Sequence, residues 1–364
     1  MGRLLALAVT TITLPLPSHA TLVANQAQYQ QFAEQGLAQM QQGWWNSQRG
    51  WYNVRSNDAS SAASMWSSYP MMELTAAVAI ADPTAANKAL VNSTFKAGEK
   101  FWDPTIEGGT GGISWLWGLR NTGNAFFDDA GWWGASYLDA YRATGNKRWL
   151  WDAGRVLSYM DRYGWDKVNG GMWWDTGANY KTSEPLAAAT LIAATLYRIE
   201  RKPYYLKLAT KYLAWADAKT RNPQQGNLYG RNATDGTVMD YVEGMMIGAH
   251  VQLCHATKQT SYCDAAESLA QASLSVFPAL HPWVPEADTI YIEGMLQLYA
   301  YDGNPTWYAL AYGNAEAAKA NSRDADGWWS RDWWGDWADP GVLFTPAATL
   351  ELFAWMAATP PPAS

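Results

Sequence analysis

The stretch Tyr241-Val-Glu-Gly-Met-Met246 recurs 50 residues later as Tyr291-Ile-Glu-Gly-Met-Leu296. A second pair, Thr144-Gly-Asn-x-x-Trp149 and Asp302-Gly-Asn-x-x-Trp307, is separated by 158 residues, close to three of these periods. Recurrence at a period of about 20–50 residues is typical of chains built from repeated supersecondary units. The repeat therefore predicts one structural unit that is used several times along the chain.

The rest of the chain has the period of amphipathic helices. Between residues 25 and 45, apolar side chains fall on one stripe with the spacing of an α-helix. Gly145-Asn146 and Gly303-Asn304 each combine a residue that ends a helix with one that caps the next. About twelve helical segments are expected, at residues 25–43, 64–82, 84–101, 129–144, 146–163, 182–200, 203–220, 238–257, 260–276, 288–302, 304–321 and 342–358.

Twelve helices grouped as six hairpins predict an all-α fold, the (α/α)6 barrel, in which the hairpins close into a toroid. An open helical solenoid is the alternative. Short turns within hairpins alternate with long connections rich in glycine and aromatic residues, which favours a closed barrel with a cleft at one end. No shift in composition marks a domain boundary, so residues 21–364 are expected to form a single domain.

The first 20 residues have the features of a secretory signal peptide. Arg3 precedes an apolar stretch, residues 4–14, and the segment ends in Ser18-His19-Ala20. No later apolar run reaches the ~20 residues needed to span a bilayer. We therefore expect an exported protein, secreted or periplasmic, with a mature chain beginning near residue 21 and no membrane span.

The charge balance narrows the class of partner. The chain has 26 Lys and Arg against 33 Asp and Glu, a net charge of −7, and loss of Arg3 makes it −8. An acidic chain offers no basic face to a phosphate backbone, so nucleic acid is not expected as a partner. A neutral ligand suits this charge better than a polyanion.

Cys254 and Cys263 are the only cysteines. An even pair at close spacing in an exported chain predicts a disulfide. Two buried free thiols are the alternative. The pair with His255 alone makes a poor ligand set for zinc, so no metal site is expected there.

Tryptophan is far more frequent than phenylalanine, with 23 Trp against 8 Phe. Flat aromatic faces stack on pyranose rings, whereas ordinary packing would explain any single tryptophan. Five clusters lie in or beside the predicted connections, at Trp115/Trp117, Trp132/Trp133, Trp173/Trp174, Trp328/Trp329 and Trp333/Trp334/Trp337. Their number favours a polysaccharide-binding surface.

Two adjacent carboxylates, Asp128 and Asp129, stand among large apolar side chains at the start of a predicted helix. Desolvation and mutual repulsion would push their pKa values apart, so that one stays ionised while the other holds a proton. Glycosidases need such a pair, one carboxylate and one carboxylic acid. N-capping is the alternative, with Asp129 accepting backbone N–H bonds and Asp128 favoured by the helix dipole.

The stretch Phe127-Asp128-Asp129-x-x-Trp132-Trp133 resembles the signature of glycoside hydrolase family 76, the α-1,6-mannanases. Further matching stretches follow over essentially the whole mature chain: Gly111-Gly-Ile-Ser-Trp115, Gly170-Gly-Met-Trp-Trp174-Asp175 and Asn179-Tyr-Lys181-Thr-x-x-Pro185. The resemblance implies an (α/α)6 barrel and a retaining mechanism. It makes Asp128 the nucleophile and Asp129 the acid/base.

The same resemblance suggests which residues bind substrate. Trp115, Trp132, Trp174, Asp175 and Lys181 lie in the stretches expected to line the cleft. The chain departs from the family pattern at Asp240-Tyr-Val-Glu243-Gly244, where a Tyr-Asn-Gln-Gly-like stretch is usual, and at Glu293, where a basic residue is usual. Glu243 and Glu293 would change subsite preference. Their alternative is a solvated or N–H-bonded helix residue.

Other chemistries find little support. No Gly-x-Ser-x-Gly elbow, phosphate loop or dinucleotide fingerprint is present, and the acids between residues 324 and 339 lack regular calcium-ligand spacing. We expect a monomeric, exported, endo-acting α-mannanase of the retaining type that needs no cofactor or metal. A transglycosylase of the same family and a non-catalytic glycan-binding protein are the alternatives.

Overall fold

The computed structural model describes residues 15–109, 111–114, 117–118, 124–277 and 283–363, and these are mostly helical. Within these described residues, twelve long helices lie close to the twelve predicted segments, and α1 begins earlier than expected, at His19. The helices are α1 (His19–Trp44), α2 (Met65–Ala81), α3 (Ala85–Gly98), α4 (Ile106–Gly109, a single turn), α5 (Phe127–Thr144), α6 (Lys147–Tyr159), α7 (Ser183–Glu200), α8 (Pro203–Lys219), α9 (Asp240–Thr257), α10 (Thr260–Val276), α11 (Pro285–Asp302), α12 (Pro305–Asn321) and α13 (Phe344–Ala358).

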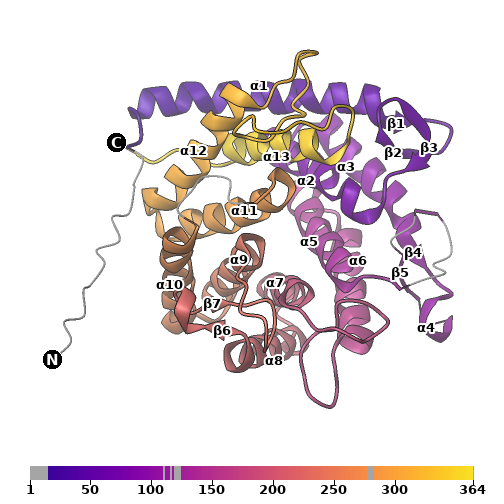
Figure 1. Ribbon diagram of the computed structural model, residues 1–364, viewed down its shortest axis with the longest axis vertical. Helices are drawn as coiled ribbons and strands as arrows, with labels where there is room; N and C mark the ends of the chain where they lie inside the picture. Colours follow the sequence, from indigo (N-terminus) through magenta and orange to yellow (C-terminus); the bar gives the residue numbers. More distant parts are fainter. Residues whose placement is uncertain (1–14, 110, 115–116, 119–123, 278–282, 364) are drawn as a thin grey trace.

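The long helices form two concentric rings (Figure 1). In the inner ring α2 contacts α5, and the contacts continue through α7, α9, α11 and α13, which returns to α2. The outer helices α3, α6, α8, α10 and α12 each pack on the inner helices beside them, and α1 packs on α13 and α2. The ring is closed, so the (α/α)6 barrel is confirmed and the open solenoid is wrong.

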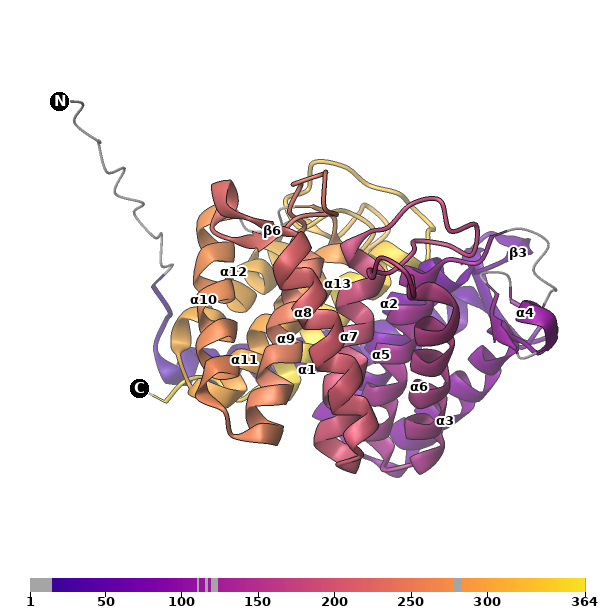
Figure 2. The same cartoon turned by 90° about the horizontal axis from the view of Figure 1, so that it is seen from below.

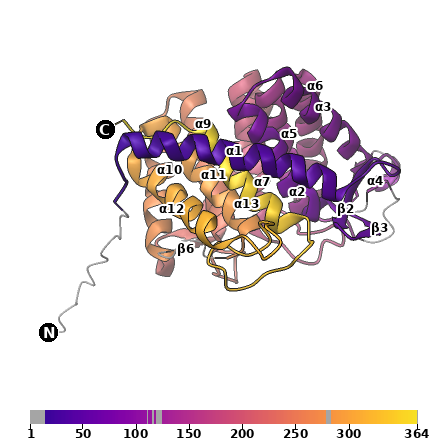
Figure 3. The same cartoon turned by 90° about the horizontal axis from the view of Figure 1, so that it is seen from above.

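Helix α1 packs against both the first and the last helix of the inner ring. Figure 3 shows α1 running across α13 and α2, the last and first inner helices. Tyr29 of α1 stacks on Phe353 of α13, with ring centroids 5.6 Å apart. The side chain of Ser18 caps α1 by accepting a bond from the Thr21 amide. Cleavage near Ala20 would fall within the first turn of this helix, and it stays a prediction.

The connections differ at the two ends of the barrel (Figure 2). Tight turns join the helices of each hairpin at one end, whereas long loops gather at the other, before the N-termini of the inner helices. Small antiparallel sheets stiffen these loops, with strands β1 (Trp45–Asn46), β2 (Trp51–Arg55), β3 (Asp58–Ala62), β4 (Trp102–Asp103), β5 (Gly112–Ile113), β6 (Arg221–Asn222) and β7 (Leu228–Tyr229).

The glycines of the sequence repeat bring two inner helices into backbone contact. A Cβ atom added to Gly294 on α11 would lie 2.1 Å from the carbonyl oxygen of Gly244 on α9. One added to Gly244 would lie 2.4 Å from the Cα of Tyr291. The repeated Tyr-x-Glu-Gly stretch therefore marks the crossing of α9 and α11, where only glycine fits.

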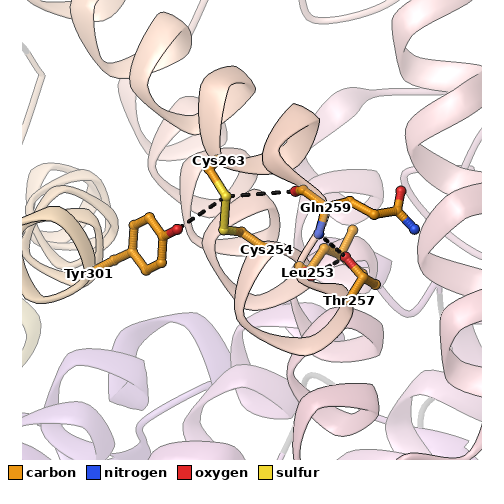
Figure 4. Close-up of a disulfide and its surroundings, with 6 residues drawn as sticks. All are labelled: Leu253, Cys254, Thr257, Gln259, Cys263 and Tyr301. Atoms are coloured by element: carbon orange, nitrogen blue, oxygen red, sulfur yellow. Dashed lines mark hydrogen bonds between the residues drawn. A yellow bond between two sulfur atoms is a disulfide. The ribbon is translucent and has the colours of Figure 1, made fainter.

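Cys254 and Cys263 form the predicted disulfide, which links the end of α9 covalently to the start of α10 (Figure 4). The Tyr301 hydroxyl donates a 3.2 Å bond to the Cys263 sulfur. Among the described residues, no helix has the length and apolar character needed to cross a membrane.

Candidate active site

The start of α5 is tied to the loop that precedes α7. The backbone N–H of Phe127 donates to the Trp174 carbonyl at 2.7 Å, and Phe126 forms a β-bridge with Asp175. The Thr176 N–H donates to the Ala125 carbonyl at 3.0 Å. These backbone bonds hold the loop, with its aromatic side chains, against the aspartate pair.

Asp128 lies in the first turn of α5 and is partly buried. Its Oδ2 accepts a 2.7 Å hydrogen bond from the indole Nε1 of Trp174, and its Oδ1 accepts the Asp129 N–H at 2.9 Å. Burial raises the pKa of Asp128 to about 6, although both hydrogen bonds oppose the rise by favouring the carboxylate. Asp128 is therefore built to hold a negative charge near neutral pH.

Asp129 is the carboxyl of the pair whose protonated form is favoured more strongly. Burial first, and then the charge of Asp128, raise its pKa well above the ordinary value. Among the described residues, no hydrogen bond reaches its carboxyl group, so nothing favours its ionised form. The cap position of α5 is Phe126, which makes no side-chain cap bond. The N-capping alternative, in which Asp129 accepts backbone N–H bonds, is therefore not observed in this part of the chain.

Lys181 contacts residues that precede Trp174 and Asp175 and holds this loop in place. Its ammonium lies 2.5 Å from Asp166 Oδ2 and donates to the Gly170 carbonyl at 2.7 Å. It also lies over the Trp173 ring, 4.6 Å from the centroid. The bonds of Lys181 thus hold the loop together. Its expected contact with substrate stays a prediction.

Two groups of aromatic side chains lie near the pair. Trp174, which binds Asp128, is 39% exposed and meets Tyr180, 42% exposed, edge to face. In the second group, ring contacts run from Trp132 to Tyr241, on which the charge of Asp128 acts, and on to Trp283, which is 40% exposed. Trp132 itself is buried and packs against Tyr241, so in this structure it does not offer a face to a substrate. Trp283 does expose a face to solvent.

Glu184 and Arg231 also belong to the site, and sequence reasoning missed both. Glu184 lies in the first turn of α7, and burial, with a smaller effect from the charge of Asp128, raises its pKa to about 7. Arg231 lies 3.6 Å from the Glu184 carboxylate. Glu184 occupies an unspecified position of the stretch 179–185, and that placement was the available signal. Arg231 stands in a loop without a recognisable pattern.

One of the predicted binding residues, Glu243, lies away from any exposed surface. Glu243 is fully buried, and its Oε1 accepts the Tyr229 N–H at 2.6 Å, which is the N–H-bonded alternative. Burial raises its pKa to about 8. With no exposed surface, Glu243 does not contact a substrate in this conformation. Trp115 lies outside the described residues.

Comparison with known proteins agrees with this geometry. Residues 114–280 match the family model of glycosyl hydrolase family 76. The resemblance to family 76 is confirmed. The matched range contains the aspartate pair, the Trp174 loop and Glu184, so this match supports glycoside hydrolase activity.

Solved family 76 structures share the fold over nearly the whole chain. A family 76 α-mannanase of Bacteroides thetaiotaomicron superposes with a TM-score of 0.81 at 20% identity, covering 94% of this chain and 98% of the other. The family 76 α-1,6-mannanase of Salegentibacter sp. HEL1_6 gives a TM-score of 0.73 at 20% identity, covering 90% and 99%. An inactive variant of that enzyme, with two consecutive aspartates replaced by alanine, was solved with α-1,6-mannotetrose.

The fold alone does not determine the reaction. A cellobiose 2-epimerase from Bacillus thermoamylovorans also superposes, with a TM-score of 0.67 at 12% identity over 91% of this chain and 99% of the other. No curated protein matches the chain significantly. The reaction must therefore be inferred from the side chains of the site.

Proposed function

We propose that this protein is an exported, retaining, endo-acting α-1,6-mannanase that uses Asp128 and Asp129 in a double displacement. One observation carries the proposal. The adjacent carboxyls have different surroundings: hydrogen bonds favour the ionised form of Asp128, whereas burial beside that charge favours the protonated form of Asp129. A retaining glycosidase requires this combination of nucleophile and proton donor.

In the first step, Asp128 attacks the anomeric carbon while the glycosidic C–O bond breaks. Asp129 gives its proton to the departing oxygen, and the product is a glycosyl ester on Asp128. Trp174 holds the attacking carboxylate through its Nε1 donor. The anomeric centre inverts once.

In the second step, Asp129 accepts a proton from water as the water oxygen attacks the anomeric carbon. The ester bond breaks, Asp128 regains its negative charge, and a second inversion restores the original configuration. Both steps balance with water as the only added reactant. They draw on no metal or cofactor.

Support for a mannan substrate comes from the exposed aromatic side chains near the aspartate pair and from the family 76 enzymes of known structure. Trp174, Tyr180 and Trp283 offer flat faces for pyranose rings, and Arg231 and Glu184 offer polar groups for hydroxyls. The Salegentibacter enzyme of the same fold is an α-1,6-mannanase and binds α-1,6-mannotetrose in its inactive form. The N-terminal sequence supports export.

The test is digestion of linear α-1,6-mannan by the mature protein, alongside Asp128→Asn, Asp129→Asn and the control Asp264→Asn, an exposed acid on α10. The parent and the control should release mannose oligomers, and each site variant should lose at least about 100-fold in rate, since nucleophile and acid/base losses are large. Proton NMR of the first product should show the α anomer.

Each other outcome rejects part of the proposal. A β anomer would contradict retention, and release of mannose alone would contradict endo action. Products longer than the substrate would identify a transglycosylase. Binding of mannan without turnover by the parent would identify a glycan-binding protein.

A further inference from the structure

Four acidic side chains converge inside the barrel, away from the aspartate pair. One carboxylate oxygen from each of Glu73 on α2, Asp139 on α5 and Glu293 on α11 lies within 4.8 Å of the other two. Glu351 on α13 stands beside them, because its charge acts on Glu73 and the charges of Glu293 and Asp139 act on it. Four inner helices thus each supply one acid to this cluster.

Positive charge is too scarce to balance the cluster. Arg142 lies 3.7 Å from Asp139, and Arg198 also acts on Asp139. Glu293 accepts a 2.9 Å bond from the neutral amide of Gln297. Of the described groups that face the cluster, four acids therefore meet two guanidinium groups, which leaves two negative charges uncompensated if all four ionise.

Two oxygens of the cluster have no partner at hydrogen-bonding distance. Glu73 is 1% exposed and Glu351 is fully buried, and Oε2 of each lacks such a partner among the described residues. The hydroxyl groups of Ser136 and Thr289 and the indole of Trp355 favour the ionised forms of Glu73 and Glu351 without balancing their burial. A buried carboxylate oxygen without a partner loses its hydration without compensation. Such an oxygen is stabilised either by a proton or by a ligand that supplies positive charge.

We propose that Glu73, Asp139 and Glu293 bind a hard divalent cation beside the charge of Glu351, with calcium as the best fit. Calcium holds carboxylate oxygens at about 2.3–2.6 Å, so two of its ligands lie at most about 5 Å apart. The 4.8 Å limit on the three oxygens meets this condition. One divalent ion supplies the two charges that the arginines leave uncompensated.

The surroundings provide an entry path and room for water. A cavity of about 390 Å³ is lined by Asp139, Glu293, Arg142 and Gln297 among others. A second cavity of about 10 Å³, bordered by Tyr69 and Glu293, has the size of one water molecule. Calcium needs six to eight oxygen ligands, and water completes such a shell.

The position implies a structural role for the ion. Asp139 lies eleven residues after Asp128 on α5, about 16 Å along the helix axis. The ion would join three inner helices, α2, α5 and α11, well below the reacting carboxyls. It would hold the barrel closed and take no part in bond cleavage.

The experiment is calcium binding to EDTA-treated full-length mature protein, measured by calorimetry and by thermal unfolding with and without calcium. The variant Glu293→Gln removes the negative charge of one proposed ligand and leaves the size and shape of the side chain almost unchanged. Glu267→Gln, an exposed acid on α10, is the matched control. We expect one calcium per parent chain, a saturable rise in Tm, and affinity at least tenfold weaker in Glu293→Gln but unchanged in the control.

A second signature separates ion binding from a simple folding defect. In EDTA, Glu293→Gln should be at least as stable as the parent, because glutamine cannot ionise among the other buried acids, whereas in calcium the parent should be the more stable. Magnesium binding with the same variant dependence would keep the site but replace the ion. Absence of stoichiometric binding of either ion, or equal affinity in parent and Glu293→Gln, would overturn the proposal in favour of a protonated cluster.

Discussion

The indole nitrogen of Trp174 donates a 2.7 Å hydrogen bond to Oδ2 of Asp128, across 46 residues of sequence. This bond joins the loop before α7 to the first turn of α5, and it favours the ionised form of the carboxyl that we propose as nucleophile. The same contact therefore fixes both the orientation and the charge of Asp128.

Trp174→Phe should raise the pH at which activity begins. In the parent, the acid limb of kcat/KM should lie near pH 6. The pKa of Asp128 is raised to about 6, and this carboxyl must be ionised to act as the nucleophile. Loss of a hydrogen bond to a charged group, worth about 1.5–3 kcal/mol, should move that limb up by about 1–2 pH units and lower the plateau.

The matched control is Trp173→Phe, which removes a neighbouring indole that makes no contact with Asp128. Its pH profile should keep the position of the parent's acid limb. An acid limb that stays in place in Trp174→Phe would show that this hydrogen bond does not set the ionisation of the nucleophile.

The fold was predictable because its signals are local. Apolar periodicity and Gly-Asn boundaries placed the helices, and the closed barrel followed from their number and from the alternation of short turns with long loops. The start of α1 was misplaced because Ser18 caps the helix within a segment that resembles the end of a signal peptide. The three small sheets were missed because strands of two to five residues are too short to show alternation.

The site was predictable only in part. The aspartate pair is contiguous, so its sequence carries the signal. Whether Glu243 faces substrate or a backbone amide depends on the Tyr229 loop, 14 residues earlier, which no helical pattern reveals. The contact between Lys181 and Asp166 and the convergence of Glu293 with Glu73 are likewise tertiary. Those relations require coordinates.

Glu243→Gln should preserve both fold and activity. The burial of Glu243 raises its pKa to about 8, so the group is protonated at pH 7, and glutamine keeps an acceptor for the Tyr229 amide. Since the unfolded carboxyl has the ordinary pKa of 4.5, the folded parent loses stability progressively as the pH rises toward 8. The Tm difference should therefore shift in favour of Glu243→Gln between pH 5 and 8.

Glu243→Ala is the contrasting variant. It leaves the Tyr229 N–H without an acceptor and creates a cavity, at a cost of about 2–4 kcal/mol in unfolding free energy by urea denaturation. If Glu243→Gln instead kept its stability but lost mannan turnover, Glu243 would be a binding residue.

Gly294→Ala should destabilise the barrel. The new Cβ would lie 2.1 Å from the Gly244 carbonyl oxygen, and a backbone atom cannot yield as a side chain can. Separating α9 from α11 should cost at least about 1–3 kcal/mol in unfolding free energy. The control is Gly43→Ala near the end of α1, where the nearest atom would be 3.7 Å away, so alanine should be neutral or slightly stabilising. Equal stability of the two variants would mean that α9 and α11 do not cross in backbone contact.

The acidic cluster should make stability in EDTA fall with rising pH. Burial, followed by the charge of Asp139, raises the pKa of Glu293 to about 8, and burial raises that of Asp139 to about 6. The folded state therefore binds more protons than the unfolded state between about pH 4.5 and pH 8, so the free energy of unfolding decreases as pH increases through this window. Each such group contributes a slope of at most about 1.4 kcal/mol per pH unit. Glu293→Gln should flatten the slope measured by urea denaturation at pH 5 to 8, and saturating calcium should flatten it in the parent. A parent whose stability is constant across this range in EDTA would show that the four carboxyls do not retain protons when the protein folds.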